Sequence, residues 1–294
     1  MNSPHTSSAA VPARNVALTA TFTSVGISSV AALVLLVGCE WYGRGGFLAR
    51  CDREIRESTQ EIDASRDDAH RAQGQSARGT AYSEKARYSR SFKLISSEEY
   101  GRLFDLAIAD HDRAVALAPG DGRFYLARGL AYYWRAVLEE RTDPKAATLY
   151  DTAKADFGRA LERDSRNEQA FDMRGLVHSA NGDHDQAIRD FAEVAKLDPH
   201  LGKMRLADAY CRRGDSDVKA KNYDLAISDY DKAIEFDAPS DGCDCQPDSP
   251  LAWTYLETRQ YDRSWEVVHR AQRAHRWIMP ELIERLKEAS GRAG

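Results

Sequence analysis

The sequence has little glycine and proline, and long uncharged runs are rare in it. Nineteen glycines and nine prolines among 294 residues are too few for a linker-rich or collagen-like chain. Basic residues do not predominate either, since 41 Lys and Arg stand against 46 Asp and Glu, for a formal charge of −5. Net charge therefore gives no general attraction to nucleic acid or to an anionic bilayer. The remaining composition, 43% apolar and 30% charged, is that of a globular chain able to bury a core.

The sequence also lacks the motifs of common enzyme classes. It contains no Gly-x-Ser-x-Gly, no His-Glu-x-x-His and no glycine-rich phosphate loop that follows a strand. Residues 181–185 superficially resemble a calcium loop but lack the glutamate that closes such a loop at its twelfth position. We therefore expect a protein that is not an enzyme, with no catalytic residues, no metal, no cofactor and no small-molecule substrate.

One uncharged run stands near the N-terminus, at residues 16–38, and is followed by Cys39. Because no other stretch is long enough to enter a bilayer, a polytopic transporter is excluded. Its end, Leu-Val-Gly-Cys, resembles the lipobox of bacterial lipoproteins. The resemblance implies that residues 1–38 are a signal peptide and that Cys39 carries a lipid such as palmitate. Since Glu40 rather than Asp follows the cysteine, the resemblance favours the outer membrane, with the rest of the chain facing the periplasm.

An uncleaved membrane anchor is a second interpretation of this run. Its 23 residues exceed the ~7–15 of a usual signal core and reach the ~20 that span a bilayer. Only Arg14 precedes the run, whereas Arg44, Arg50, Arg53 and Arg56 follow it, and basic residues prefer the cytoplasmic side. This arrangement favours a single-pass inner-membrane protein whose remaining chain lies in the cytoplasm, as an adaptor or co-chaperone. A buried helix in a soluble protein is the third interpretation.

A helical repeat is the main feature of the rest of the chain. Its clearest unit, residues 168–201, reads EQAFDMRGLVHSANGDHDQAIRDFAEVAKLDPHL. Small residues at Gly175 and Ala187, an aromatic at Phe191 and a proline at Pro199 follow one another without gaps. This pattern resembles the tetratricopeptide repeat, in the variant whose first helix carries an Arg-Gly pair. The resemblance implies an all-α solenoid of helix hairpins.

The spacing within the unit has a physical basis. We expect Gly175 to face Ala187, because antiparallel helices approach closely only where side chains are small, and a larger residue there costs ~1–3 kcal/mol. Phe191 is expected to fill the space between neighbouring units, where its truncation costs ~3–5 kcal/mol. The Asn-Gly dipeptide after the first helix tolerates the left-handed backbone of a tight turn, and Pro199 cannot continue a helix.

Four further units depart from this pattern to different degrees. Their small, small and plug positions are Gly79, Ala107 and His111; Gly129, Ala153 and Phe157; and Gly214, Ala226 and Tyr230. In a degenerate last unit, Ser264, Val268 and Ala271 stand where small and apolar residues belong. The second of these carries an insertion, so we expect both of its helices to be long, with Asp143 and Pro144 capping and opening the later one. The insertion in the first carries residues 96–99, which suit a helix start.

The repeat resemblance defines the domain boundaries. It spans residues 68–276 and implies about four to five repeats. Residues 39–67 are expected to form a linker and an N-terminal helix. Residues 277–294 are expected to form a C-terminal capping helix and tail, which would cover the exposed end of the solenoid.

Four units share a pair of opposite charges at matching positions. The arginines are Arg78, Arg128, Arg174 and Arg213, and the acids are Asp110, Asp156, Asp190 and Asp229. Each arginine either pairs with such an aspartate, within or between units, or is solvated on the outer face. An exposed pair contributes only ~0–1 kcal/mol to stability.

The resemblance also implies a binding surface, because tetratricopeptide solenoids bind peptides or helices in a groove lined by their first helices. The matching positions here are Arg123, Leu126, Leu130, Tyr133, Trp134, Gln169, Asp172, Leu176, Asp208, Cys211, Asp215 and Lys219. Tyr133 and Trp134 are the expected anchors, since aromatic side chains dominate interfaces, unless they only pack against the second helix. The Lys, Asn and Arg set that clamps a peptide carboxylate in some family members is not present. We expect a membrane-tethered scaffold that binds a protein partner in cell-envelope assembly, with no role in binding nucleic acid.

The sequence contains five cysteines, among them Cys39 and Cys51. In an oxidising compartment Cys211 would be able to form a disulfide with Cys243 or Cys245. Free thiols are one alternative. A metal site is another, although zinc usually needs four ligands.

Overall fold

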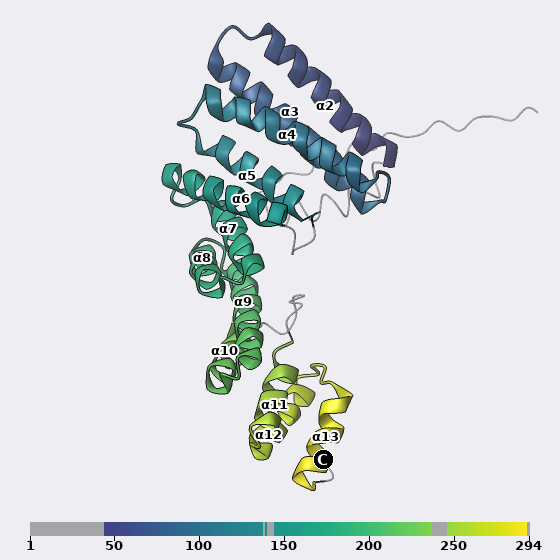
Figure 1. Ribbon diagram of the computed structural model, residues 1–294, viewed down its shortest axis with the longest axis vertical. Coiled ribbons are helices and arrows are strands. Elements are labelled where there is room, and N and C mark those ends of the chain that lie inside the picture. The colour runs from purple at the N-terminus through teal and green to yellow at the C-terminus, as the bar shows by residue number, and fades with distance from the viewer. Residues whose placement is uncertain (1–43, 138, 140–143, 237–245, 293–294) are drawn as a thin grey trace, which may run out of the picture. The chain divides into compact units, whose positions relative to one another are not determined.

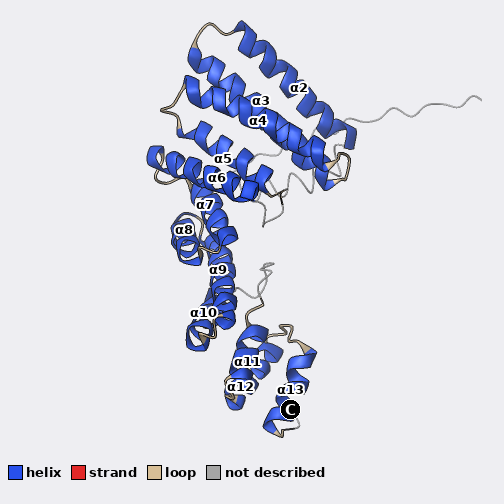
Figure 2. Ribbon diagram, viewed as in Figure 1, coloured by secondary structure: helices blue, strands red, loops and turns tan. Residues whose placement is uncertain are grey.

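The described part of the protein is built from α-helices. The computed structural model describes residues 44–137, 139, 144–236 and 246–292, and within these ranges there are twelve helices and no strand (Figure 2). The helices are α2 (Arg44–Ala64), α3 (Asp68–Ser91), α4 (Ser97–Leu117), α5 (Gly122–Ala136), α6 (Pro144–Arg163), α7 (Glu168–Asn181), α8 (His184–Leu197), α9 (Pro199–Lys219), α10 (Tyr223–Phe236), α11 (Asp248–Glu257), α12 (Tyr261–Arg273) and α13 (Pro280–Ser290).

The helices pair as five successive hairpins, α3–α4, α5–α6, α7–α8, α9–α10 and α11–α12, which follow one another in Figure 1. We call the first helix of each hairpin helix A and the second helix B. Helix B of each hairpin packs on helix A of the next, and α13 packs on α11 and α12. The predicted all-α solenoid of four to five tetratricopeptide-type hairpins, closed by a C-terminal helix, is confirmed.

The predicted membrane anchor, residues 1–38, and the lipidation site, Cys39, lie outside the described residues. Along the ranges given above, no helix has both the length and the hydropathy that crossing a bilayer requires.

Short polar side chains start several helices. The Oγ of Ser96 accepts the backbone N–H of Glu99 at 3.1 Å, which confirms the helix start predicted there. Asp67 and Asn167 accept the N–H of His70 and Ala170 in the same way. Such caps satisfy N–H groups that would otherwise have no partner in the first turn.

Two compact turns set the geometry around hairpin α7–α8. Gly182 ends α7 with φ +83°, the left-handed conformation that glycine adopts without strain, as predicted. Asp198 both ends α8 and caps α9, accepting the N–H groups of His200 and Leu201. Pro199 therefore opens the next helix directly, and no loop separates hairpins three and four.

The expectation that both helices of the second hairpin are lengthened was only half right. Helix α6 has 20 residues and begins at Pro144 as predicted, but α5 has 15 residues and ends at Ala136. The inserted residues extend helix B and the connection before it, so helix A keeps nearly the length of α7, which has 14 residues. The predicted cap, Asp143, lies outside the described ranges.

In four of the five hairpins, a glycine of helix A lies beneath a ring of helix B. A Cβ built on Gly175 would lie 2.5 Å from Cε1 of Phe191, and its three nearest atoms all belong to that ring. The nearest neighbour is thus Phe191 and not Ala187, which corrects the expected pairing of two small residues. The same relation holds in the other hairpins for Gly79 with His111, Gly129 with Phe157 and Gly214 with Tyr230, at 2.7–2.9 Å. Because the glycine has no side chain, the ring can pack against its backbone, and the ring then fills the space between the two helices of the hairpin.

The same rings join neighbouring hairpins. Phe191 is 1% exposed and clusters with Leu206 and Ala209 of α9. Its predicted role as a filler between units is confirmed. Since Phe157 and Tyr230 are also fully buried in such clusters, each plug ties its hairpin to the one that follows.

Helices α2 and α13 are the additional elements at either end of the hairpins. Helix α2 is tied to α3 by Arg50 with Glu84 at 3.1 Å and by Asp52 with Lys85 at 2.7 Å. In α13, Leu282 and Leu286 are fully buried within the cluster formed by the last hairpins. Both helices therefore cover hairpin surfaces, as predicted for the C-terminal one.

Candidate functional site: the helix-A face

Four hairpins carry a buried bidentate ion pair between helix A and helix B. In each, the arginine Nε and Nη2 donate to the two oxygens of one aspartate, at 2.6–2.9 Å: Arg78 with Asp110, Arg128 with Asp156, Arg174 with Asp190, and Arg213 with Asp229. The aspartates are no more than 5% exposed. The predicted pairing is confirmed within units, and because the acids are buried, the solvated alternative is wrong.

Two of these arginines also link consecutive hairpins. Arg128 Nη1 donates to Asp112 of α4 at 2.8 Å, and Arg213 Nη1 donates to Asp185 of α8 at 2.5 Å. The hydrogen bond to the paired aspartate is the main cause that raises the pKa of each of the four arginines. The charged form is thereby held in place, and the relative position of the A helices is fixed electrostatically as well as by packing.

The A helices present the candidate binding face. Helix α5 contacts both α3 and α7. Arg205 of α9 makes a bidentate pair with Asp172 of α7, with Nε–Oδ1 and Nη2–Oδ2 distances of 2.6 and 3.0 Å. Successive A helices therefore lie near one another, and their side chains form the continuous surface that we call the helix-A face.

The two predicted aromatic anchors are half-buried and already packed. The rings of Tyr133 and Trp134 meet edge to face at 5.1 Å, and Tyr133 also lies 5.9 Å from Tyr150 of α6. The guanidinium of Arg87 lies 4.3 Å over the Trp134 ring. The structure therefore combines both interpretations, since each ring packs inside the solenoid and also keeps a solvent-facing part.

The predicted acidic groove residues are mostly engaged with neighbours. Asp172 is 8% exposed and held by Arg205. Asp208 accepts from Arg212 on the same helix at 2.7 Å, and Asp215 accepts the hydroxyl of Tyr230 at 2.7 Å. These carboxylates organise the face more than they offer free charge to a ligand.

The other predicted groove residues divide into two groups by exposure. Arg123, Gln169 and Lys219 are exposed, and Arg123 is held by Asp121 at 2.6 Å. Leu126, Leu130 and Leu176 are half-buried and pack against the cores of hairpins two and three. The face therefore alternates apolar patches with fixed polar groups, which suits a partner chain better than a small molecule.

Arg205 is a groove-face residue that the sequence pattern did not reveal. It lies in the first two turns of α9, which begins at Pro199, well before the position where the repeat expects helix A to begin. An arginine alone carries no signal, and Asp198, Pro199 and Gly202 are residues typical of a connection between repeats, so the sequence did not indicate the longer helix.

Cys211 faces the interior of the fourth hairpin and is disulfide-bonded. Cys51 is a free thiol whose pKa burial raises to about 12. The predicted pairing of Cys211 with Cys243 or Cys245 remains a prediction, because both of those residues lie outside the described ranges.

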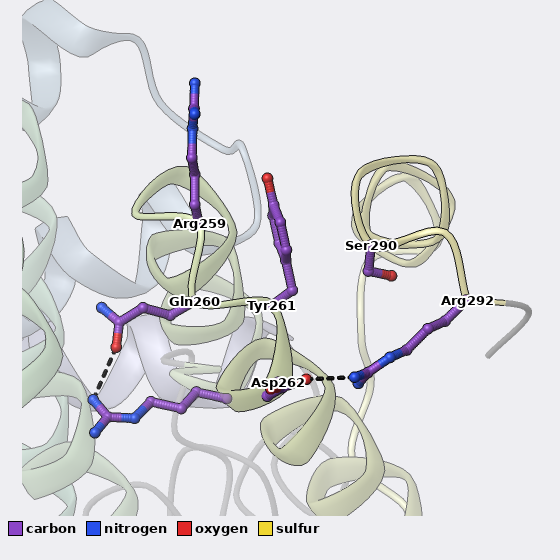
Figure 3. A pocket seen from close by; sticks show the side chains of 7 residues that line it. Arg259, Gln260, Tyr261, Asp262, Ser290 and Arg292 are labelled. Atoms are coloured by element: carbon purple, nitrogen blue, oxygen red, sulfur yellow. Dashed lines mark hydrogen bonds and ion pairs between the residues drawn. The ribbon is translucent and has the colours of Figure 1, made fainter.

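A polar pocket lies at the turn between α11 and α12 and is shown in Figure 3. Arg292 reaches across from the end of α13 to Asp262, at 2.6 Å, and Gln260 accepts from Arg263 at 2.9 Å. Arg259 and Tyr261 extend in the same direction from the turn. Asp262 is the one carboxylate among the residues that line this pocket, against three arginines, and it is paired with Arg292. In the described chain, no group of three or more His, Cys, Asp or Glu is arranged to hold a metal ion.

The family model described as "Tetratricopeptide repeat" matches residues 168–201 and 207–239. These segments cover hairpin three and, except for residues 202–206, hairpin four. They include Gly175 and Gly214 with their covering rings, so the matched segments fall on the two hairpins that combine the standard spacing with a glycine beneath a ring.

Two curated relatives match parts of the chain. The small glutamine-rich tetratricopeptide repeat-containing protein 2 of Mycosarcoma maydis is 33% identical over 92 residues, which are 31% of this chain and 25% of that protein. The human serine/threonine-protein phosphatase 5 is 28% identical over 125 residues, 42% of this chain and 22% of that protein. The chain thus spans about a quarter of the length of the curated relatives that it matches.

Solved structures show likeness of a similar kind. A thermophilic tetratricopeptide protein of Thermus thermophilus is 18% identical, covering 81% of this chain and 98% of that one, with a TM-score of 0.39. A structure of MamA is 15% identical and covers 74% of this chain and 94% of that one, with a TM-score of 0.41.

Proposed function

From the premise that the chain contains tetratricopeptide repeats, we propose that it is a non-enzymatic scaffold whose helix-A face binds a peptide or helix of a partner protein. Tetratricopeptide folds typically serve as interaction scaffolds. The observation that carries the proposal is the helix-A face itself, where ion pairs such as Arg205 with Asp172 hold neighbouring A helices in fixed positions. A surface fixed before binding loses less conformational entropy when a partner docks.

Site-specific photocrosslinking tests this assignment. A photoreactive amino acid at Gln169, which is exposed on helix A, should capture a discrete partner in cells. The matched control is Glu193, which is half-buried on helix B of the same hairpin. Capture from Gln169 alone supports the proposal. Equal capture from both positions, or from neither, contradicts it.

We further propose that the scaffold is tethered to the cell envelope by a lipid on Cys39 and acts there in envelope assembly. The support is the uncharged run at residues 16–38 and the lipobox-like residues that end it. Labelled palmitate should enter the protein, and Cys39→Ser should abolish the label. Incorporation that survives Cys39→Ser would refute lipidation at this residue.

The second candidate is a single-pass inner-membrane protein with cytoplasmic repeats, acting as an adaptor or co-chaperone. The basic residues that follow the run, Arg44 to Arg56, favour it. A membrane-impermeant thiol probe applied to intact cells after mild reduction separates the two. Labelling of Cys243 or Cys245 requires the repeats to lie outside the cytoplasm, and protection until lysis favours the second candidate.

A further inference from the structure

Two arginines near the C-terminal end of α3 differ from the other arginines of the A helices. The A helices carry eleven arginines, all in α3, α5, α7 and α9. Arg87 and Arg90 form no ion pair with a residue that the structure describes, and Arg90 donates instead to the hydroxyl of Ser97 at 3.3 Å. The other nine each pair with a carboxylate: Arg71, Arg78, Arg123, Arg128, Arg135, Arg174, Arg205, Arg212 and Arg213.

Each of these two guanidinium groups lies over an aromatic ring. Cζ of Arg87 is 4.3 Å from the centroid of the Trp134 ring on α5, and Cζ of Arg90 is 5.2 Å from that of Tyr100 on α4. Tyr100 donates its hydroxyl hydrogen to the carbonyl of Trp134 at 3.2 Å, so the two rings belong to one cluster. A guanidinium over a ring keeps the N–H groups at its edge for a carboxylate in its own plane.

The charge of this cluster is positive and is not balanced. Burial raises the pKa of the Tyr100 hydroxyl, and the charges of Arg90, Arg87 and Arg135 oppose that shift, so all three arginines lie near it. Arg135 is neutralised by Asp105 at 3.0 Å, whereas the other two keep their charge. Since the whole chain has a formal charge of −5, this end of the helix-A face is a local exception that attracts acidic groups.

An apolar patch adjoins the arginines. Val137, directly after α5, is 47% exposed. It follows Trp134 by three residues and continues the helical backbone of α5, a spacing that places both side chains on one face. The Trp134 ring itself keeps a solvent-facing part. A segment bound here would therefore meet positive charge from α3 and apolar surface from α5.

This surface favours a protein segment over a nucleic acid. A nucleic acid needs a track of basic groups that follows its phosphates, and here only two arginines are without a carboxylate. The side chain of Asp105, which is 64% exposed, would repel a phosphate close to them. A single acidic side chain beside an apolar one matches both the charge and the patch.

We propose that this end of the helix-A face, formed by Arg87, Arg90, Trp134 and Val137, binds a segment of the partner protein in which a glutamate or aspartate adjoins an apolar residue. The inference rests on the proposed scaffold function and names the chemistry of its partner. The carboxylate accepts hydrogen bonds from the two guanidinium groups, and the apolar side chain packs on the tryptophan and the valine.

The experiment uses the full chain and a defined probe. The probe is a fluorescein-labelled peptide that repeats Ser-Glu-Leu three times and ends in an amide, so that no terminal carboxylate contributes. Matched peptides carry glutamine or lysine in place of every glutamate, and a labelled oligothymidylate tests nucleic acid. Fluorescence anisotropy at low and at physiological salt measures binding. The glutamate peptide should bind and weaken with salt, whereas the other three probes should not bind.

Three variants locate the site. Arg87→Gln with Arg90→Gln should weaken binding of the glutamate peptide by about tenfold or more, through the loss of charge-assisted hydrogen bonds. Arg87→Lys keeps the charge but loses the planar fork and should weaken it by roughly threefold. Val137→Ser should also weaken it by roughly threefold, with the salt dependence unchanged. Because both arginines are exposed, unchanged thermal unfolding should show that the variants fold.

The matched control removes two other arginines that have no carboxylate partner among the described residues. In Arg273→Gln with Arg285→Gln, both positions are exposed, and Arg285 also lies over a tryptophan ring, that of Trp253, at 5.4 Å. These residues belong to α12 and α13 and not to an A helix. The control should leave the affinity for the glutamate peptide unchanged.

The outcomes separate this inference from the scaffold function. Failure of the glutamate peptide to bind, equal weakening by the control, or binding of the oligothymidylate alone overturns the assignment. If the glutamate peptide fails but crosslinking from Gln169 captures a partner, the scaffold stands and its partner is not acidic at this position. If the peptide binds as expected but Gln169 captures nothing, the acidic-segment site stands and the wider helix-A face fails.

Discussion

Arg174 and Asp190 meet inside the third hairpin in a bidentate pair, with Nε–Oδ2 and Nη2–Oδ1 distances of 2.9 and 2.6 Å. The aspartate is 5% exposed, whereas 27% of the arginine side chain remains exposed. The pair therefore differs from a surface ion pair, because removing the arginine leaves a buried charge without compensation.

Replacing one partner should reveal this difference. We expect Arg174→Ala to lower the free energy of unfolding by ~3–5 kcal/mol, the range for breaking a buried ion pair. The control is Glu193→Ala in α8, which breaks an exposed pair with Lys196 at 2.6 Å and should cost ~0–1 kcal/mol. Denaturant unfolding measures both. A similar small loss in the two variants would show that Asp190 is not dependent on its partner.

The contact between Gly175 and Phe191 gives a second prediction. Alanine usually stabilises a helix relative to glycine by ~1 kcal/mol, but at Gly175 its methyl group would lie 2.5 Å from the ring. We expect Gly175→Ala to destabilise the protein by ~1–3 kcal/mol through overpacking. Gly158→Ala is the matched control, because Gly158 is helical and a Cβ there meets nothing within 4 Å. It should stabilise the protein, as measured by the same unfolding experiment.

The double variant Gly175→Ala with Phe191→Val tests the cause of that destabilisation. If the ring is the obstacle, the double variant should be no less stable than Phe191→Val alone, since valine leaves room for the methyl group. Additive losses would place the clash elsewhere.

The last hairpin has an alanine at the position of the glycine and a valine at the position of the ring. At the spacing that puts Gly175, Ala187 and Phe191 in hairpin three, hairpin five has Ala252, Ser264 and Val268. Ser264 is buried and donates to the carbonyl of Ala252 at 2.7 Å. An alanine is thus accommodated where valine replaces the ring, and the sequence of the same hairpin has apolar residues at the two Arg-Asp positions. Hairpin five thus lacks both the glycine–ring contact and the Arg-Asp pair. This is expected if the two features stabilise the same packing of helix A on helix B.

Features that repeat along the chain could be predicted from the sequence, whereas features made by a single contact could not. The glycines, the plugs and the Arg-Asp positions recur in four units, and all were placed correctly except that Gly175 faces Phe191 first. The length of α5 could not be predicted, because an insertion can enter a helix or a connection, and its residues do not decide between them. The pair of Asp172 with Arg205 depends on where the added first turns of α9 lie relative to α7, which no spacing encodes.

Cys211 provides a prediction about the residues that follow α10. It is disulfide-bonded, and we expect its partner to be Cys243 or Cys245. Peptide mapping of the native protein by mass spectrometry without reduction should yield one crosslinked pair that contains Cys211. Free thiol at Cys211 in protein purified from its native compartment would contradict the pairing and would favour a reducing location.

The plug of the first hairpin is a histidine, and this gives the stability of the protein a specific pH dependence. His111 is 1% exposed, its Nδ1 has no hydrogen-bond partner among the described residues, and burial lowers its pKa from 6.5 to about 4. Nearby Asp110 opposes this shift and Arg128 adds to it. Between pH 6.5 and 4 the unfolded chain binds a proton that the folded chain does not. The free energy of unfolding should therefore decrease as the pH is lowered from 6.5 to 4. The total loss should be roughly 2–4 kcal/mol, at ~1.4 kcal/mol per unit of pKa difference.

His111→Phe should remove that dependence, because the other hairpins place Phe157, Phe191 or Tyr230 over the equivalent glycine. The comparison is the difference between the two unfolding profiles from pH 7.5 to 4, measured by urea denaturation. Taking the difference cancels the contribution of carboxylates that titrate in both proteins. We expect the curves to run parallel above pH 6.5 and to diverge below it, with the phenylalanine variant more stable in acid. Curves that remain parallel to pH 4 would contradict the prediction, because they would mean that folding does not lower the pKa of His111.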